Sequence, residues 1–573
     1  MRASKEEFPS VLSGIHPRHG GWGFRVATTT VPFLLRECIS AIEDVIEFDL
    51  HPSGAERVRD EIIRKVSGNS IAKKLTKVPL DLYLQTDGKN LETLLRNLRA
   101  LARDVTPHTY RMAIIEQLQT AAATEKEKIC FLAEELVCTL TNIGFDLSCV
   151  NERCEQVFFN SDYVPSNGRL QDFLESFNVN RDSIKEYSAL IRAHGDLEHV
   201  QSDVLKLFRC EVTDSVPEEF DAGKIKAAAF NSQKYLHIKG AKSFDPYSAA
   251  KLVTRNLARL RDLLGMFYHK GSTNFSDAIA LSEVGIPNST KIIKPSGNLM
   301  QLIADNTRST AARKLEGMIK TVRLPAGDDG EKFFRIVDFH GMSLNTAMPE
   351  NQLINLWTSL ETIAPSIKGK SIISSVCAGI KPLVGLQYVR RTFSAVYGDL
   401  RRWDRQKTRA ALKLIEGDGD LIDKTFLLIA SPENEKSCIQ LLSEMNDFPL
   451  LKRRVFELNS RFKSGEKTLK AVELHLTKVE QQLHRIYRAR NAIVHSAKDI
   501  RLTDNLIISA HEYFDQVFSL TVELSSKPNR FESYAECFSF CELAYSAYST
   551  KLMELKDAPV AEAASFVWRS DRK

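Results

Sequence analysis

The chain has 573 residues and a formal net charge of +5, with 43% hydrophobic and 26% charged residues. The length allows three or four domains with full cores, and the composition is that of a soluble globular protein, not of a fibrous or disordered one. The small positive charge argues against a protein that coats nucleic acid over its whole surface, so any basic surface must be local.

The ten cysteines are spread along the chain, and none forms a CxxC pair. The closest spacings, Cys149/Cys154 and Cys537/Cys541, come without a matching set of histidines. We therefore expect reduced cysteines packed as small apolar groups, with no metal and no other cofactor. The N-terminus is polar with mixed charges, and no run of about 18 apolar residues exists, so we expect a cytoplasmic protein with no membrane partner.

Residues 1–198 are predicted to be a mainly helical N-terminal region. Its Gly-rich segment HPRHGGWGF lacks the strand and helix that flank a phosphate-binding loop, so we interpret it as a turn or an extended arm. Residues 91–102 and 126–144 have helical periodicity, and Gly144 is expected to end the second of these helices.

Residues 199–345 are predicted to be a small central α+β domain. A helix is expected at 245–267, with Asp245-Pro246 at its start. Strand-like alternation is found at 204–212, 224–230, 234–240 and 332–340.

Residues 346–557 are predicted to be an all-α helical bundle, followed by a frayed tail at 558–573. The GDGD segment at 417–420 does not complete a calcium loop, because the acidic spacing and the terminal Glu are missing. The fold class expected for the whole chain is therefore multidomain α+β, with most of its residues in helices.

One long helix near the end of the chain carries the candidate site. Its apolar seam follows alternating steps of three and four: Leu469, Val472, Leu476, Val479, Leu483 and Ile486. The next steps reach Arg490 and Ile493, so a guanidinium stands where an apolar residue is expected and needs a partner or an anion. Asn491 and His495 are four residues apart and share a helix face beside Arg490.

The spacing Arg-x4-His occurs three times in the chain, and its context separates the copies. The copy that ends at His108 contains Pro107, which breaks a helix, and the copy that ends at His340 lies in a predicted strand. Only the copy that ends at His495 follows a long amphipathic helix and has a polar residue directly after its Arg.

The segment YRARNAIVHS (487–496) resembles the R-polar-x3-H motif of HEPN-domain ribonucleases. A second segment, PENQLINLWTSLETIA (349–364), is similar to the first core helix of the Apea-like HEPN branch, with Trp357 and Glu361 on one face. The resemblance covers roughly residues 340–555. Residues 365–460 add helical patterns between the two segments, which are either an insertion or extra bundle helices.

The resemblance implies a HEPN-like helical bundle that dimerises and sets two R-x4-H motifs face to face. It also implies metal-independent RNA cleavage that leaves a 2′,3′-cyclic phosphate and a 5′-hydroxyl. The implied partners are RNA, a second copy of the chain, and a phage-derived trigger or an antitoxin. A bacterial anti-phage or abortive-infection effector, held in check by its N-terminal and central regions, is therefore the leading interpretation.

The residue types suit this chemistry. His495 can act as general base or acid near neutral pH, and Arg490 presents a planar fork of donors to phosphate oxygens. Asn491 can orient His495 or hold a phosphate oxygen. Tyr487 can stack on a base, and Glu361 can fix the guanidinium or set the histidine tautomer.

Structural roles remain open for each of these residues. Arg490 and Glu361 can form a buried ion pair, His495 and Asn491 can be polar helix-end residues, and Tyr487 can be a packing residue. The same fold would also serve as a non-catalytic RNA-binding or dimerisation module, or as a helical adaptor.

A basic cluster, RRWDRQKTR (401–409), surrounds an aromatic residue. Its Arg401, Arg402 and Arg405 can contact RNA phosphates or form a solvated helix face.

Overall fold

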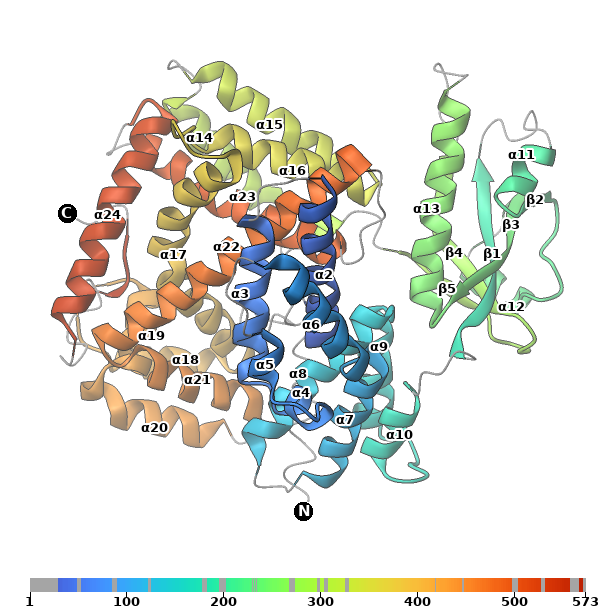
Figure 1. Ribbon diagram of the computed structural model, residues 1–573, viewed down its shortest axis with the longest axis horizontal. Helices are drawn as coiled ribbons and strands as arrows, with labels where there is room; N and C mark the ends of the chain where they lie inside the picture. Colours follow the sequence, from blue (N-terminus) through green and yellow to red (C-terminus); the bar gives the residue numbers. More distant parts are fainter. Residues whose placement is uncertain are drawn as a thin grey trace. The chain divides into compact units, whose positions relative to one another are not determined.

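The computed structural model shows a mostly helical protein with one small sheet (Figure 1). The residues that it describes are 29–48, 53–84, 90–121, 125–177, 183–194, 202–228, 230, 232, 234–266, 274–295, 299–302, 308–324, 329–417, 419–445, 448–496, 503–526, 531–556 and 566–569. They belong to two compact units. One unit contains Val66–Leu299, and the other contains Glu37–Lys65 together with Met300–Lys573. This arrangement agrees with the multidomain α+β fold class.

The first unit contains a five-stranded antiparallel sheet with the strand order β2–β3–β1–β4–β5 (Figure 1). Helix α13 (Pro246–Gly265) covers one face, where its apolar side chains pack with Ile191. Leu190 points to the other face and packs with Ile225 of α12 (Ala222–Ala227), because successive strand residues point to opposite faces. The strands are β1 (Lys185–His194), β2 (Cys210–Thr213), β3 (Tyr235–Ser243), β4 (Asn274–Glu283) and β5 (Lys291–Ile293).

Helices make up the rest of the first unit, and their predicted starts and ends are confirmed where the capping signals were strong. Asp245 accepts hydrogen bonds from the backbone of Tyr247 and Ser248 and begins α13. Gly144, with φ of 130°, ends α8. The helices are α4 (Ser70–Leu75), α5 (Leu80–Leu84), α6 (Leu91–Asp104), α7 (Pro107–Thr120), α8 (Lys126–Ile143), α9 (Leu147–Cys154), α10 (Arg169–Glu175) and α11 (Ser202–Leu207), with a π-helical segment η2 (Glu155–Phe159).

The second unit is all helical in its described residues. It includes most of α2 (Val31–Phe48) and of α3 (Ser53–Ser67), which lie far from the rest of the unit in sequence. The other helices are α14 (Arg308–Thr321), α15 (Gly330–Asn345), α16 (Pro349–Ile363), α17 (Ile372–Trp403), α18 (Arg405–Lys413), α19 (Leu421–Ala430), α20 (Glu435–Glu444), α21 (Pro449–Phe462), α22 (Gly465–Ser496), α23 (Thr503–Ser525) and α24 (Tyr534–Glu554).

Helix α17 forms the core of this unit and packs against α19, α22, α23 and α24. Among the described residues it is the one helix long and apolar enough to cross a membrane by length and composition. Of its most apolar window, 61% is buried inside the protein. Its apolar residues are therefore used for packing against neighbouring helices.

Two segments that were predicted to be strands are helices, which is a correction. Residues 224–230 lie largely in α12, and residues 332–340 lie in α15. In α15, Phe333 and Ile336 are buried while Phe334 is 57% exposed. Buried residues three positions apart indicate a helix. The apparent strand alternation arose because Phe334 is apolar but exposed.

Other strand predictions were right in part. Residues 204–212 are the end of α11 followed by β2, and residues 234–240 correspond to β3. Strands β1, β4 and β5 were not predicted, and β1 begins at Lys185, inside the range assigned to the N-terminal region.

Residues 300–345 belong to the second unit and not to the unit that contains the sheet. The HPRHGGWGF segment lies outside the described residues.

The predicted frayed tail is corrected at residues 566–569, which pack on the second unit. Phe566 is 1% exposed, and its ring centroid lies 5.6 Å from that of Phe426 on α19. Tyr548 donates a hydrogen bond of 2.8 Å to the Phe566 carbonyl. These contacts attach the described end of the chain to α19 and α24.

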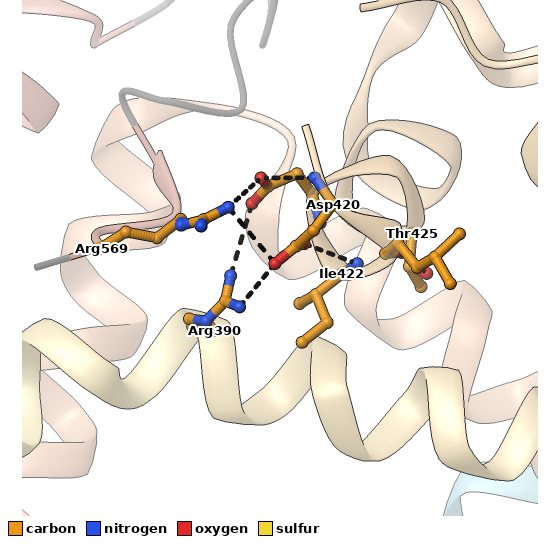
Figure 2. Close-up of polar contacts among 7 residues, drawn as sticks. Arg390, Asp420, Ile422, Thr425 and Arg569 are labelled. Carbon is orange, nitrogen blue, oxygen red and sulfur yellow. Dashed lines mark hydrogen bonds and ion pairs between the residues drawn. The ribbon is translucent and has the colours of Figure 1, made fainter. Parts of the chain in front are cut away.

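An ion-pair cluster adds to this attachment (Figure 2). Arg390 Nη2 lies 2.6 Å from Asp420 Oδ2, and Arg569 Nη1 lies 3.3 Å from the same oxygen. Asp420 also begins α19 by accepting a hydrogen bond from the backbone of Ile422. The GDGD segment therefore ends in a helix cap whose carboxylate joins α17, α19 and the end of the chain.

We expect Phe566→Ala to lower the free energy of unfolding by about 3–5 kcal/mol, because it leaves a cavity against Phe426. Urea unfolding measures this value. Trp568→Ala is the control, since Trp568 is only partly buried. An unchanged stability in Phe566→Ala would show that the tail does not pack as described.

Candidate functional site

Helix α22 buries the predicted apolar seam along its whole length. All six seam residues, from Leu469 to Ile486, are at most 9% exposed. Arg490, which continues the seam, is only partly buried, and His495 in the last turn is exposed. The motif therefore lies where the helix passes from the packed bundle to solvent.

Arg490 has a buried stem and a polar end. Its Nη1 donates a hydrogen bond of 3.0 Å to Asn491 Oδ1. Its Nε is buried and has no hydrogen-bond partner among the described residues. A buried guanidinium nitrogen without an acceptor carries a desolvation cost, which an anionic oxygen that reached it would recover.

Trp357 connects the two segments that carry the family resemblance. It is fully buried on α16, and its indole nitrogen donates a hydrogen bond of 2.8 Å to Glu361 Oε2. Its ring centroid lies 5.2 Å from that of Tyr487 on α22, at an interplanar angle of 45°. The predicted shared face of Trp357 and Glu361 is confirmed, and Tyr487 is in contact with α16.

The ion pair between Arg490 and Glu361, one of the structural alternatives left open, is not formed. Within the described part of the chain, no hydrogen bond or ion pair joins these two side chains, and the contact of Glu361 is with Trp357. Glu361 therefore orients an indole, which fixes the ring against which Tyr487 packs. The interpretation of Glu361 as the partner of Arg490 is wrong for this arrangement.

A second buried face of α22 was missed in the sequence. Gln482, Arg485 and Ala489 follow steps of three and four and are 6%, 6% and 5% exposed. Arg485 Nε lies 2.9 and 2.8 Å from the two carboxylate oxygens of Glu37, and its Nη2 lies 2.7 Å from Glu61 Oε2. Both carboxylates come from the N-terminal helices, so no local sequence signal could have indicated the pairing.

Electrostatics fix the charge state of this cluster. Burial acts to raise the pKa of the Glu37 carboxyl, but Arg485 and Arg488 outweigh it and hold that pKa below its ordinary value. Burial acts to lower the pKa of Arg485, and Glu37 and Glu61 raise it. Each charge is thus stabilised by its partners. The cluster attaches α2 and α3 to α22, the helix that carries the motif, within one or two turns of Arg490.

A cavity of about 570 Å³ lies beside the earlier turns of α22. Glu480 forms ion pairs of 2.9 Å with Arg57 and 2.8 Å with Lys381 at its wall. His484 also lines it, and burial followed by the charges of Arg488 and Arg57 lowers the pKa of this histidine to about 4. His484 is therefore neutral in the folded protein at neutral pH.

The basic cluster predicted at 401–409 surrounds the junction of α17 and α18. Arg401, Arg402 and Arg405 are exposed. Arg401 lies over the Tyr397 ring at 5.7 Å, and Arg402 forms an ion pair of 3.1 Å with Asp399. Local partners therefore engage two of the three cations, and RNA contact by this cluster remains a prediction.

All ten cysteines are free, and nine of them are buried. Their burial agrees with the expectation that they pack as small apolar groups. Burial raises the pKa of Cys377, which lines the cavity, to about 12, so its thiol is protonated and unreactive at neutral pH.

A group of potential metal ligands lies elsewhere in the second unit. It consists of His340 on α15 and of His511 and Asp515 on α23.

We expect Arg485→Met to lower the free energy of unfolding by about 3–5 kcal/mol. The substitution leaves the largely buried carboxylates of Glu37 and Glu61 without the guanidinium that pairs with both of them. Adding Glu37→Gln and Glu61→Gln should recover most of the loss, since the carboxylates are then neutral. Denaturant unfolding of the single and triple variants measures both values. A triple variant no more stable than Arg485→Met would contradict this account.

We expect His484 to make stability depend on pH. The folded-state pKa of about 4 lies below the usual 6.5, so the unfolded chain binds a proton more readily. Stability should fall as pH drops from about 6.5 to 4, by up to ~3 kcal/mol, and stay constant above pH 7. Unfolding of wild type and His484→Gln at several pH values tests this. His495→Gln, which changes an exposed histidine on the same helix, should keep the wild-type slope.

Comparisons with known proteins give no relative for this chain. No family model, no curated protein and no solved structure matches it. The functional interpretation therefore depends on the residues of α22 and α16 and on the geometry that joins them.

Proposed function

We propose that this protein is an endoribonuclease that cleaves RNA without a metal ion at a composite site formed by two copies of a HEPN-like bundle. The observation that supports this best is the position of the motif. Arg490, Asn491 and His495 lie at the surface end of α22, and the turn before them is fixed by the contact of Tyr487 with Trp357. A motif held on a rigid helix and open to solvent is accessible both to RNA and to a second copy.

The proposed reaction uses the 2′-hydroxyl of the RNA as nucleophile. One His495 takes the proton from this hydroxyl, and the His495 of the second copy gives a proton to the leaving 5′-oxygen. Arg490 stabilises the negative charge of the pentavalent phosphorane with its guanidinium. Asn491 keeps that guanidinium in place through its side-chain oxygen. The products are a 2′,3′-cyclic phosphate and a 5′-hydroxyl.

We propose that the N-terminal region restrains or positions this site. The support is the ion-pair cluster of Arg485 with Glu37 and Glu61, which attaches α2 and α3 to the motif helix. A trigger or an antitoxin that alters these helices would act on α22 directly. Together with the family resemblance, this favours a cytoplasmic bacterial effector of anti-phage defence or abortive infection.

The test is cleavage of total cellular RNA by purified protein in EDTA, with end-group analysis of the products. We expect wild type to leave 2′,3′-cyclic phosphates and His495→Ala to lose at least about 100-fold in rate, as is typical for loss of a general acid or base. His108→Ala, which changes an exposed histidine on α7, should cleave like wild type.

Extract from phage-infected cells provides a second arm, in which the trigger is present. Cleavage that is equal in wild type and His495→Ala, or that stops in EDTA, would contradict the proposal. Lack of cleavage in both arms would also contradict it and would favour a protein that binds RNA without cutting it.

RNA binding without catalysis is the alternative that one observation favours. His495 is exposed, and among the described residues no hydrogen bond orients its ring. A binding module would lose RNA affinity in Arg490→Ala and would be nearly indifferent to His495→Ala. The adaptor interpretation, in which Arg490 is needed for folding, is weakened because Glu361 pairs with Trp357 and not with Arg490.

A further inference from the structure

We infer that His340, His511 and Asp515 form a binding site for a zinc ion between α15 and α23. The Nε2 atoms of the two histidines lie 3.1 Å apart, and His511 Nε2 lies 3.5 Å from Asp515 Oδ1. All three ligand atoms lie within 4.8 Å of one another. The inference is independent of the proposed nuclease, whose residues lie on α22.

Two of the three separations between ligand atoms suit a four-coordinate ion, and the third, between His340 and Asp515, is within 4.8 Å and would shorten on binding. With zinc–nitrogen and zinc–oxygen bonds of about 2.0–2.1 Å, tetrahedral ligands lie roughly 3.3–3.4 Å apart. The distances of 3.1 Å and 3.5 Å lie just below and just above this value. The alternative is a hydrogen bond between two neutral imidazoles, which accounts for the distance of 3.1 Å between the histidines without an ion.

The protein holds the three ligands in place from both helices. His511 and Asp515 are four residues apart on α23 and therefore share one face. The His340 ring stacks on Phe514 with centroids 4.9 Å apart, which fixes its plane. Phe333 of α15 and Phe518 of α23 lie 5.8 Å apart and add an apolar contact between the same helices.

The ligand set selects the class of ion. Two imidazoles and one carboxylate favour zinc or a similar divalent transition metal, while magnesium and calcium prefer oxygen ligands. The His511 side chain is 9% exposed and that of Asp515 is 45% exposed, so the site is buried on one side and open on the other. Water would complete the coordination at the open side, as in three-ligand zinc sites.

The test measures zinc directly, with full-length protein freed of histidine tags. Protein dialysed against chelator and then against zinc should hold one ion per chain by elemental analysis, and zinc should raise its thermal unfolding midpoint. Cobalt in place of zinc should give the visible absorption of a tetrahedral ion. His340→Gln, His511→Gln and Asp515→Asn should each weaken zinc binding by at least about tenfold, with folding checked by circular dichroism.

His108→Gln is the matched control and should bind zinc like wild type, because His108 is exposed and lies outside the cluster. Equal zinc content in wild type and the folded His340→Gln and Asp515→Asn variants would overturn the inference, as would folded wild type that holds no zinc. Neither result bears on RNA cleavage, which is measured in EDTA.

Discussion

The buried guanidinium of Arg485 is the constraint on which the second unit depends. A cation at a position that is 6% exposed is tolerated only when carboxylates surround it, and here they come from Glu37 and Glu61. Because those carboxylates lie more than 400 residues earlier in the sequence, helices α2 and α3 become part of the C-terminal bundle. Glu37–Lys65 accordingly belongs to the same compact unit as Met300–Lys573.

The same constraint decides where the motif lies. One face of α22 packs on its apolar neighbours, a second face is held by α2 and α3, and the last described turn of the helix is exposed. Arg490 and His495 are at that end, while the Trp357 contact fixes Tyr487 just before them. A helix buried on two faces cannot rotate freely, so the orientation of the motif is set by the bundle.

Periodicity and capping residues were enough to predict much of the helical architecture, including the whole seam of α22 and the first residue of α13. The errors have a physical cause in each case. Residues 332–340 carry exposed apolar side chains that imitate strand alternation, and the Arg485 pairing depends on residues far away in sequence. Of the candidate site, the shared face of Trp357 and Glu361 was predicted, but the partner of Glu361 was not, because an indole and a guanidinium are both suitable donors.

Long-range pairing also explains why this cluster of potential metal ligands was not predicted. His340 and His511 are separated by 171 residues and carry no spacing that marks a metal site, and His340 was assigned to a strand. Only when residues 330–345 are a helix does the His340 ring meet the face of α23 that presents His511 and Asp515. The wrong strand prediction and the missed cluster therefore have a common cause, which is that the periodicity of residues 330–345 is helical.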